Sequence, residues 1–275
     1  MTPPSALPWS SADPERLAQV VGVLTDIDDT LTTEGAIPMG VVAALAALRE
    51  AGLPTIAVTG RPMGWSLPVA SATPLAAVVA ENGGVALIRD GDDVAIEFAD
   101  ADDVRAANAA RLARVAERIV AEVPGATLAR DSAGRVTDIA VDHGEFAHLG
   151  QQQIDAVVAL MRAAGMQATV SSIHVNGWFG THTKLTGARW IVRRVLGRDL
   201  DGERDRWLYV GDSTNDEPMF AAFPLSVGVA NIADFADRLQ RWPAYVTQLD
   251  RGRGFVEIAE ALVDARGRSA AMAGR

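Results

Sequence analysis

Three carboxylates are crowded into one short segment near the start of the chain, at Asp26, Asp28 and Asp29. The segment follows the apolar run Val20–Leu24, which is typical of a short buried strand. Because side chains alternate along an extended backbone, Asp26 and Asp28 are expected to point to the same side. Two converging carboxylates suit a hard divalent cation such as Mg²⁺, which prefers oxygen ligands.

A purely structural interpretation of this cluster is also open. Aspartate is a good turn and helix N-cap residue, and Asp-rich turns after strands are common. However, unpaired charge beside an apolar core is costly, which favours a function for carboxylates at the end of a buried strand. The rest of the chain has to decide between the two interpretations.

Further candidates follow two more of the expected strands. Thr59 comes after the apolar stretch Leu53–Val58, while Asp212 and Asp216 come after Trp207–Val210. Parallel strands bring their carboxyl ends to one edge of a sheet, where ligands bind in a crevice. We therefore expect these side chains to meet the aspartate cluster there, although they are far apart in sequence.

The first and last thirds of the chain alternate expected strands and helices, which predicts a parallel α/β sheet. Lys184 opens the helix expected at 184–196 and is a further candidate for the crevice. The remaining expected helices of this part lie at 38–51, 63–71, 233–240 and 254–265. Further strands are expected at 75–80 and 225–229, with a hairpin of 85–89 and 94–98 around a turn at 90–93.

The middle of the chain has the order helix, strand, strand, and then repeats it. Helices are expected at 102–122 and 151–164, and strands at 126–130, 136–142, 167–171 and 173–178. Such a duplicated unit makes a small antiparallel sheet covered on one face by two helices. The predicted organisation is an α/β core at 20–87 and 183–266, an inserted domain at 88–182, and tails at 1–19 and 267–275.

Composition limits the classes of partner. The 275 residues carry a formal net charge of −10, so a nucleic-acid partner, which needs a basic surface, is not expected. No apolar stretch is long enough to span a membrane, and the N-terminal segment lacks the features of a secretory signal. The chain has no cysteine, which excludes disulfides and fits a reducing cytoplasm. The sequence does not indicate an oligomeric state.

Taken in order, these segments resemble the four motifs of the haloacid dehalogenase (HAD) superfamily of phosphohydrolases. The matching residues are 26–30 (DIDDT), 59–61 (TGR), Lys184 and 211–216 (GDSTND). The insert lies between the second and third motifs and resembles the type IIB cap of Cof-like, sucrose-phosphate and mannosyl-3-phosphoglycerate phosphatases. Asn82 and Gly83 resemble a turn of that branch. Asp29 is a departure, since many relatives have glycine there. The resemblance implies a Rossmann-like core with an inserted α+β cap.

The resemblance also implies roles for the motif residues. Asp26 would attack phosphorus and form an aspartyl-phosphate. Asp28 would protonate the leaving alkoxide and then act as base, which requires a raised pKa. Thr59 would hydrogen-bond a phosphoryl oxygen, and Lys184 would neutralise charge in the transition state. The structural alternatives are a helix cap for Thr59 and a solvated surface position for Lys184.

A Mg²⁺ cofactor is implied as well. Its ligands would be Asp26, the backbone carbonyl of Asp28, Asp212, and Asp216 either directly or through water. Alternatively, Asp216 is only a helix cap. The residues expected to bind phosphate or substrate in the core are Thr59, Gly60, Arg61, Asn82, Gly83, Lys184 and Asn215.

In the insert, His174, Asn176 and Trp178 share one face of an expected strand. Imidazole, amide and indole groups on one face could recognise a polyol, so His174 and Asn176 are predicted substrate contacts. As an alternative, this face is the solvent side of the cap, or Trp178 belongs to its core. We expect Arg135 and His143 at the surface.

The sequence therefore predicts a cytoplasmic, Mg²⁺-dependent phosphomonoester hydrolase with an aspartyl-phosphate intermediate. Its substrate would be a small phosphorylated metabolite, either a sugar phosphate or a phosphoglycerate. A phosphohexomutase and a non-catalytic protein that binds phosphometabolites are the alternatives. Dehalogenase activity is disfavoured, because a carbon–halogen substrate has no need of Asp28.

Overall fold

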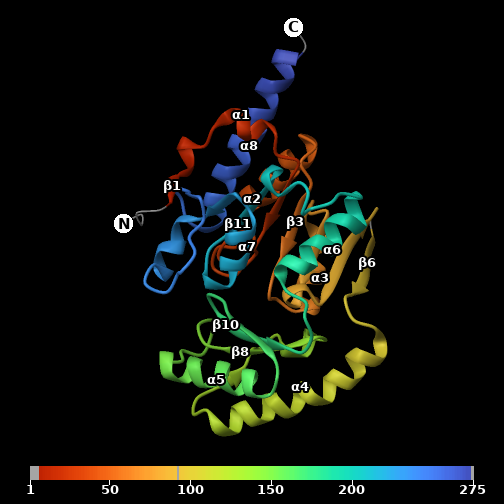
Figure 1. Ribbon diagram of the computed structural model, residues 1–275, viewed down its shortest axis with the longest axis vertical. Helices are drawn as coiled ribbons and strands as arrows, with labels where there is room; N and C mark the ends of the chain where they lie inside the picture. Colours follow the sequence, from red (N-terminus) through yellow and green to blue (C-terminus); the bar gives the residue numbers. More distant parts are fainter. Residues whose placement is uncertain (1–5, 92, 274–275) are drawn as a thin grey trace.

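The computed structural model describes residues 6–91 and 93–273 and contains two sheets (Figure 1). Residues 1–5 and 274–275 of the expected tails, and Asp92 of the expected turn, lie outside the described residues. In sheet order, the strands of the larger sheet are β1 (Leu7–Pro8), β13 (Tyr245–Val246), β12 (Leu225–Gly228), β11 (Trp207–Gly211), β2 (Gly22–Thr25), β3 (Thr55–Val58), β4 (Ala77–Ala80), β5 (Val85–Asp90) and β6 (Asp93–Phe98). Neighbours from β1 to β4 are parallel, and β5 and β6 are antiparallel additions.

The central strands are buried on both faces, as near-continuous apolar runs in a parallel sheet require. Alternate residues of a strand enter different cores, so that Leu208 joins one cluster and Tyr209 the other. One face is covered by α1 (Pro14–Ala18), α2 (Met39–Glu50), α3 (Met63–Ala72) and α8 (Arg251–Ala273). The other face is covered by α6 (Lys184–Leu196), α7 (Glu217–Ala222) and the 3-10 helix η6 (Ala230–Phe235).

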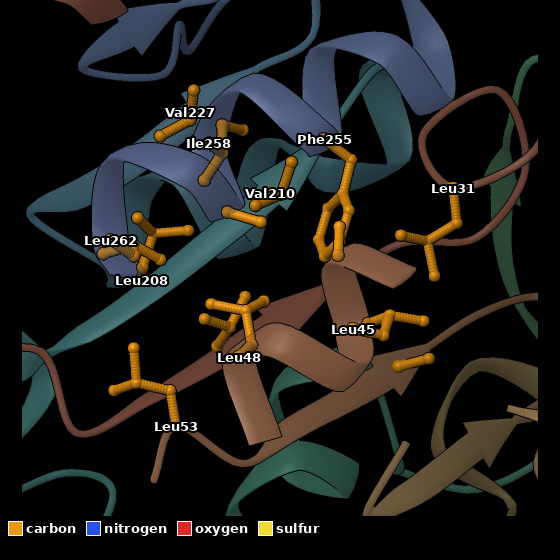
Figure 2. Packing of buried hydrophobic residues seen from close by; sticks show 14 of the residues in the cluster. Leu31, Leu45, Leu48, Leu53, Leu208, Val210, Val227, Phe255, Ile258 and Leu262 are labelled. Atoms are coloured by element: carbon orange, nitrogen blue, oxygen red, sulfur yellow. The ribbon is translucent and has the colours of Figure 1, made fainter. Parts of the chain in front are cut away.

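Figure 2 shows how the first of these faces is packed. Phe255 and Ile258 of α8 lie against the strands, and Leu45 and Leu48 of α2 lie beside them. All four side chains are buried. This packing fixes the strands firmly, so the loops at their carboxyl ends are held in defined positions.

The smaller sheet is antiparallel, in the order β7 (Thr127–Leu128), β8 (Asp138–Asp142), β10 (His174–Trp178) and β9 (Gln167–Val170). Two helices, α4 (Asp102–Glu122) and α5 (Gln151–Ala163), run along one side of it (Figure 1). Ile119, Val157 and Met161 form its separate apolar core together with residues of β8 and β10. The predicted α/β fold with a mostly parallel core sheet and an antiparallel insert is confirmed.

Three details differ from the expected organisation. The hairpin β5–β6 extends the large sheet, so we propose that the insert begins after Phe98 instead of at residue 88. Trp9 and Leu17 are buried against the core, and β1 pairs with β13, so we propose that residues 6–19 belong to the core. The α-helix expected at 233–240 is wrong, because η6 is a 3-10 helix that ends at Phe235 and only turns follow it. The N–H groups of residues 240 and 241 donate to the Glu217 carboxylate instead.

Candidate active site

Side chains from three elements meet at the carboxyl edge of the large sheet. Asp26 directly follows β2, Asp216 ends the 3-10 helix η5 (Thr214–Asp216), and Lys184 is the first residue of α6. Lys184 Nζ lies 3.0 Å from Asp26 Oδ1 and 2.8 Å from Asp216 Oδ1. All three side chains are buried. The carboxyl edge of the parallel sheet therefore brings two carboxylates and one cation together.

The start of α6 is fixed by local sequence. Thr183 is the N-cap residue, and its Oγ1 accepts a hydrogen bond from the backbone N–H of Thr186. The turn before β5 supports this helix end, because Gly83 has a φ of +107°. A Cβ on Gly83 would lie 2.3 Å from the carbonyl oxygen of Thr183, so only glycine fits. Lys184 is thereby held in one place relative to Asp26.

Lys184 is the only lysine in the chain, whereas arginine supplies all the other strong bases. This count is a sequence signal that the motif-based prediction did not use. A compact ammonium with three donors can lie between two carboxylates at 3 Å, where a planar guanidinium would need different geometry. The choice of lysine at this position therefore fits the shape of the site.

Asp26, Asp212 and Asp216 form a buried group whose ligand oxygens all lie within 4.8 Å of one another. Among the described residues, Asp212 Oδ1 is buried and has no hydrogen-bond partner. A buried carboxylate oxygen without a partner is costly unless a cation or donor satisfies it. The cluster therefore fits a hard divalent cation with oxygen ligands.

Burial governs the titration of this cluster. It raises the pKa of Asp26 to about 7, against the positive charge of Lys184, which acts in the opposite direction. Burial and the neighbouring carboxylates raise the pKa of Asp212 well above its usual range. Burial lowers the pKa of Lys184, but Asp216 and Asp26 outweigh it and the net shift is upward. The ammonium is therefore charged, and a bound cation would favour the ionised carboxylates.

Asp216 is surrounded by donors. Its Oδ1 accepts from Lys184 and from the hydroxyl of Tyr209, and its Oδ2 accepts from the backbone N–H groups of Asp212 and Ser213. A Cβ on Gly211 would lie 2.4 Å from Asp216 Oδ2, which explains the glycine there. These four bonds fill the usual acceptor sites of a carboxylate. Asp216 thus organises the loop and orients Lys184.

Asp28 lies in a different polar network, which joins the core to the cap. The Nε of Arg61 donates to Asp28 Oδ1 at 2.8 Å and to Oδ2 at 3.0 Å. Burial raises the pKa of Asp28, and the Arg61 charge opposes that rise. Arg61 itself lies over the ring of Trp65, with 4.8 Å from the guanidinium carbon to the ring centroid. The raised pKa agrees in direction with the requirement for an acid–base group.

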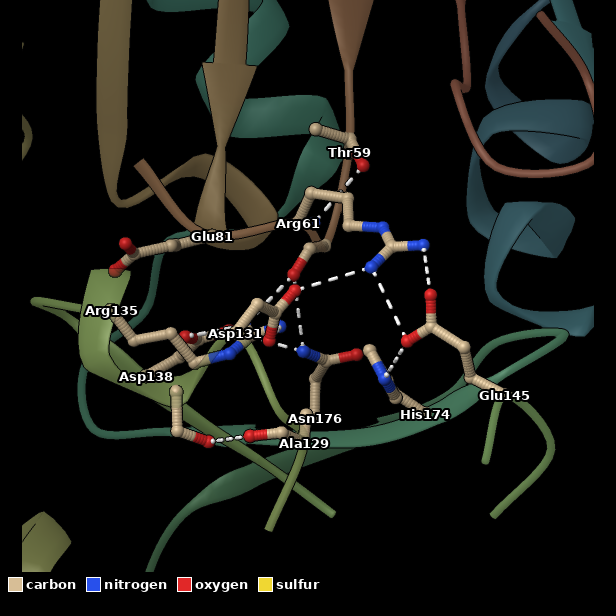
Figure 3. A network of polar contacts seen from close by, with 12 residues as sticks. Thr59, Arg61, Glu81, Ala129, Asp131, Arg135, Asp138, Glu145, His174 and Asn176 are labelled. Carbon is tan, nitrogen blue, oxygen red and sulfur yellow. Dashed lines mark hydrogen bonds and ion pairs between the residues drawn. The ribbon is translucent and has the colours of Figure 1, made fainter. Parts of the chain in front are cut away.

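The cap supplies further partners for Arg61 (Figure 3). Glu145 Oε1 accepts from Arg61 Nη2 at 2.9 Å, and Asp131 Oδ2 accepts from Nη1 at 3.2 Å. His174 Nε2 lies 3.1 Å from Glu145 Oε2. The bonds from His174 and Arg61 lower the pKa of Glu145 to about 2. Sequence reasoning missed both carboxylates, because nothing local marks loop residues that meet Arg61 across two domains.

A second contact holds the cap at Gly60. Its carbonyl oxygen accepts from Asn176 Nδ2 at 3.2 Å and from Arg135 Nη1 at 2.9 Å. The surface position expected for Arg135 is wrong, since its side chain is 2 % exposed. Arg135 is buried because Asp138 pairs with it at 2.8 Å within the interface. Asn176 and Gly60 thus meet, as two of the predicted binding residues.

Three other predicted residues follow the carboxyl ends of β3, β4 and β11. Thr59 is buried and its Oγ1 accepts from the backbone N–H of Arg61 at 3.0 Å. Asn82 is buried with a φ of +56°, and its Nδ2 has no partner among the described residues. Asn215 is buried and accepts from the Ser213 hydroxyl at 2.9 Å. Thr59, Asn82 and Asn215 therefore remain candidates for contact with a ligand.

Trp178 does not fit the predicted polyol-reading face. It is buried, its Nε1 donates to the carbonyl oxygen of His182 at 2.9 Å, and its ring stacks on the His182 ring. Glu81, also missed from sequence, is a second link between core and cap. Its carboxylate accepts from the backbone N–H groups of Val136 and Thr137. These contacts hold the cap strands against the core.

Comparisons with known proteins agree with this architecture. Residues 23–113, which contain Asp26, Asp28 and Thr59, match the family model of the haloacid dehalogenase-like hydrolases. No curated protein sequence matches the chain. Among the described residues, no helix combines the length and apolar character needed to cross a bilayer.

Several solved structures share the fold at low sequence identity. A protein from Thermoplasma acidophilum has a TM-score of 0.67 and 16 % identity, covering 88 % of this chain and 98 % of its own. The C-terminal domain of trehalose-6-phosphate phosphatase from C. albicans has a TM-score of 0.65 and 14 % sequence identity. The match covers 95 % of this chain and 99 % of that domain. The sucrose-phosphatase from Synechocystis, solved with sucrose and phosphate, has a TM-score of 0.62 and 14 % sequence identity. The match covers 89 % of this chain and 98 % of the sucrose-phosphatase chain.

The family match covers residues 23–113, and over that part the chain is similar to the haloacid dehalogenase-like hydrolases. The solved structures share its fold, an α/β core with an inserted antiparallel cap. The resemblance predicted from the four motifs is confirmed.

Proposed function

We propose that this hydrolase removes the phosphate from a phosphorylated sugar, with Mg²⁺ as cofactor and a phosphorylated Asp26 as intermediate. The observation that supports this most is the buried contact of Asp26 with Lys184, beside a buried Asp212 oxygen that has no partner. A nucleophilic carboxylate needs a cation beside it to approach a phosphate dianion. The site supplies one such cation in Lys184 and oxygen ligands for another.

The reaction proceeds in two balanced steps. Asp26 forms a bond to phosphorus while the bond from phosphorus to the ester oxygen breaks, and Asp28 gives its proton to the departing alkoxide. A water molecule then attacks phosphorus, Asp28 takes a proton from it, and the bond to Asp26 breaks. The products are the free alcohol and inorganic phosphate. Lys184 stabilises the charge on the transferring phosphoryl group in both steps.

Mg²⁺ would be held by Asp26 and Asp212, where it would neutralise charge on the phosphoryl oxygens. We propose that Asp216 contacts the ion only through other groups, because its acceptor sites are filled by Lys184, Tyr209 and two backbone N–H groups. The predicted ligand role of the Asp28 carbonyl remains a prediction.

The cap indicates the kind of leaving group. The polar network that joins Asp28 to the cap is acidic overall, since it contains more carboxylates than guanidinium groups. The carboxylates are Asp28, Asp131, Asp138 and Glu145, and the guanidinium groups are Arg61 and Arg135. An anionic leaving group such as a glycerate would find no free cation in this network. A neutral polyol has hydroxyl groups that can donate to carboxylates and accept from amides, so a sugar phosphate is the better match.

A panel of phosphoesters tests this proposal. Purified protein with Mg²⁺ is incubated with sugar phosphates and phosphoglycerates, and released inorganic phosphate is measured. We expect the highest kcat/KM with a sugar phosphate, and no release by Asp26→Asn. A preference for phosphoglycerates would contradict the assigned leaving group. Dependence on an added hexose bisphosphate without net phosphate release would instead indicate a phosphohexomutase.

A further inference from the structure

The side chain of Asn231, in η6, joins three segments that are remote in sequence. Its Nδ2 donates to the carbonyl oxygen of Asp29 at 3.0 Å and to Asp212 Oδ2 at 3.3 Å. Its Oδ1 accepts from the backbone N–H of Arg251 at 2.9 Å. The aspartate loop, the Asp212 segment and the first residue of α8 therefore share one amide.

The orientation of this amide is determined by its partners. The carbonyl oxygen of Asp29, which faces Nδ2, can only accept, and the backbone N–H of Arg251, which faces Oδ1, can only donate. A flipped amide would place an oxygen against two oxygens and an NH₂ against an N–H. Asn231 is also buried, so water offers no easy replacement for these contacts. Every hydrogen bond in the arrangement is thus specific for the asparagine side chain.

The two backbone groups that Asn231 contacts belong to residues in the left-handed region. Asp29 and Arg251 each have a φ of +51°, a backbone angle that residues other than glycine rarely adopt. Their side chains are joined as well, with Arg251 Nε 2.9 Å from Asp29 Oδ1. Such strained residues persist only where the surrounding structure holds them, and they are concentrated at functional sites. Here the restraint comes from Asn231 and from the ion pair.

The consequence for Asp212 concerns its two oxygens. Asn231 engages Oδ2, whereas Oδ1 is buried without a partner among the residues described. A donor on one oxygen fixes the rotation of a carboxylate and leaves the other oxygen free to bind an ion. We propose that Asn231 is a positioning residue for the cation site. It orients Asp212 and holds the Asp29 loop at a fixed distance from it.

This inference rests on the proposed metal-dependent function, but it can be tested without any phosphoester. Calorimetric titration of the full chain with Mg²⁺ gives the dissociation constant for wild type and for Asn231→Ala. We expect Asn231→Ala to raise that constant about 10- to 100-fold, as is usual when a group that orients a metal ligand is removed. In phosphate-release assays, the Mg²⁺ concentration for half-maximal rate rises in parallel, while KM for the phosphoester at saturating Mg²⁺ changes less than about twofold.

Arg251→Ala is the matched control. It removes the ion pair to Asp29 but leaves the backbone N–H that donates to Asn231 Oδ1. We expect its Mg²⁺ dissociation constant to stay within about threefold of wild type, since Asp212 keeps its donor. Equal effects of both substitutions would overturn the inference, because they would show that tethering of α8 alone matters. A wild-type Mg²⁺ affinity in Asn231→Ala with a lowered melting temperature would also overturn it.

A second variant covers the case in which Asn231→Ala does not fold. Asn231→Ser is smaller and still polar, and its short hydroxyl cannot make all three contacts, so the same rise is expected. The outcomes separate the two proposals. Wild type that binds Mg²⁺ but hydrolyses no phosphoester contradicts the proposed function alone, whereas unchanged Mg²⁺ affinity in the Asn231 variants contradicts this inference alone.

Discussion

Two polar regions of the molecule, which meet at the segment of Asp26 and Asp28, are built in opposite ways. Around Asp26, Lys184 and Asp216, every group comes from the core and lies where the topology of the sheet places it. Around Arg61, two of the three ion-pair partners, Asp131 and Glu145, come from the cap, and Asp28 comes from the core. The first region has the groups for chemistry, and the second joins the chemistry to whatever lies under the cap.

From this comparison we propose that reaction and substrate choice are determined separately. Substitutions in the core region should remove turnover with any substrate, whereas substitutions in the cap network should change rates moderately and unequally among substrates.

Replacement of the proposed nucleophile has the largest expected effect. Asp26→Asn should lower kcat on the order of 10⁴-fold or more, because the residues of a covalent mechanism act as a unit. Phosphate release in the presence of Mg²⁺ measures the loss. Asp29→Asn is the matched control, since Asp29 has no assigned chemistry, and its kcat should fall far less. Comparable losses in both variants would contradict the division of roles within the cluster.

Lys184 should come next in effect. Lys184→Met leaves Asp26 and Asp216 buried without their cation, so we expect kcat to fall about 10²- to 10³-fold. Breaking a buried pair should also lower the free energy of unfolding by about 3–5 kcal/mol. Activity assays and denaturant unfolding measure the two effects. Lys184→Arg keeps the positive charge but changes the placement of the donors between the two carboxylates. Full activity in that variant would contradict the fit argued for lysine.

Replacement of Asp212 should have opposite effects on the stability of the metal-free protein and on Mg²⁺ binding. Its pKa is raised by burial, so ionisation of the group opposes folding of the metal-free protein, and Asp212→Asn should stabilise that form. The variant should lose the stabilisation by Mg²⁺, which for wild type is about 2.7 kcal/mol at a hundredfold excess over the dissociation constant. Melting curves with Mg²⁺ and with a chelator measure both effects. Equal Mg²⁺ stabilisation of variant and wild type would place the ion elsewhere.

In the cap network, Glu145→Gln should have a smaller effect that depends on the substrate. It removes the charge-assisted bonds to Arg61 and His174, each typically worth about 1.5–3 kcal/mol. We expect kcat/KM to change by different factors for different sugar phosphates, while generic aryl phosphates are affected least. A uniform loss across the panel would show that Glu145 acts on the chemistry and not on the leaving group.

The smallest predicted effect is on pH dependence. The pKa of Glu145 is about 2 in the folded protein and 4.5 without its partners, so its ionised form stabilises the closed cap. This stabilisation is complete above about pH 4.5 and is lost as the pH falls toward the folded value near 2. Between these pH values, the free energy of unfolding should change less steeply with pH for Glu145→Gln than for wild type. Identical slopes would mean that the cap network does not depend on this charge.

The same division explains how much of the molecule could be predicted from sequence. The positions of Asp26, Thr59 and Asp212 could be predicted, because each follows a buried apolar strand and parallel strands end at one edge. The motif residues carry their own local signals of type and spacing. Lys184 was found in the same way, and its uniqueness as a lysine is an additional signal.

The contacts between core and cap could not be predicted. Glu145 and Asp131 lie in loops with no periodic pattern, and their partner Arg61 is about 70 or more residues away. Arg135 was expected at the surface because arginine usually is, and only the tertiary pairing with Asp138 buries it. Asn231 carries no motif signal at all, since its role depends on three contacts to remote segments.

The central claim is that Asp26 carries the phosphoryl group, and trapping that group tests it most directly. Protein mixed with radiolabelled substrate and Mg²⁺ is quenched in acid within one turnover, reduced with borohydride and mapped by mass spectrometry. We predict an acid-stable phosphorylated intermediate and conversion of residue 26 to homoserine. Label on another residue, or turnover at full rate with no labelled protein at any time, would contradict the account.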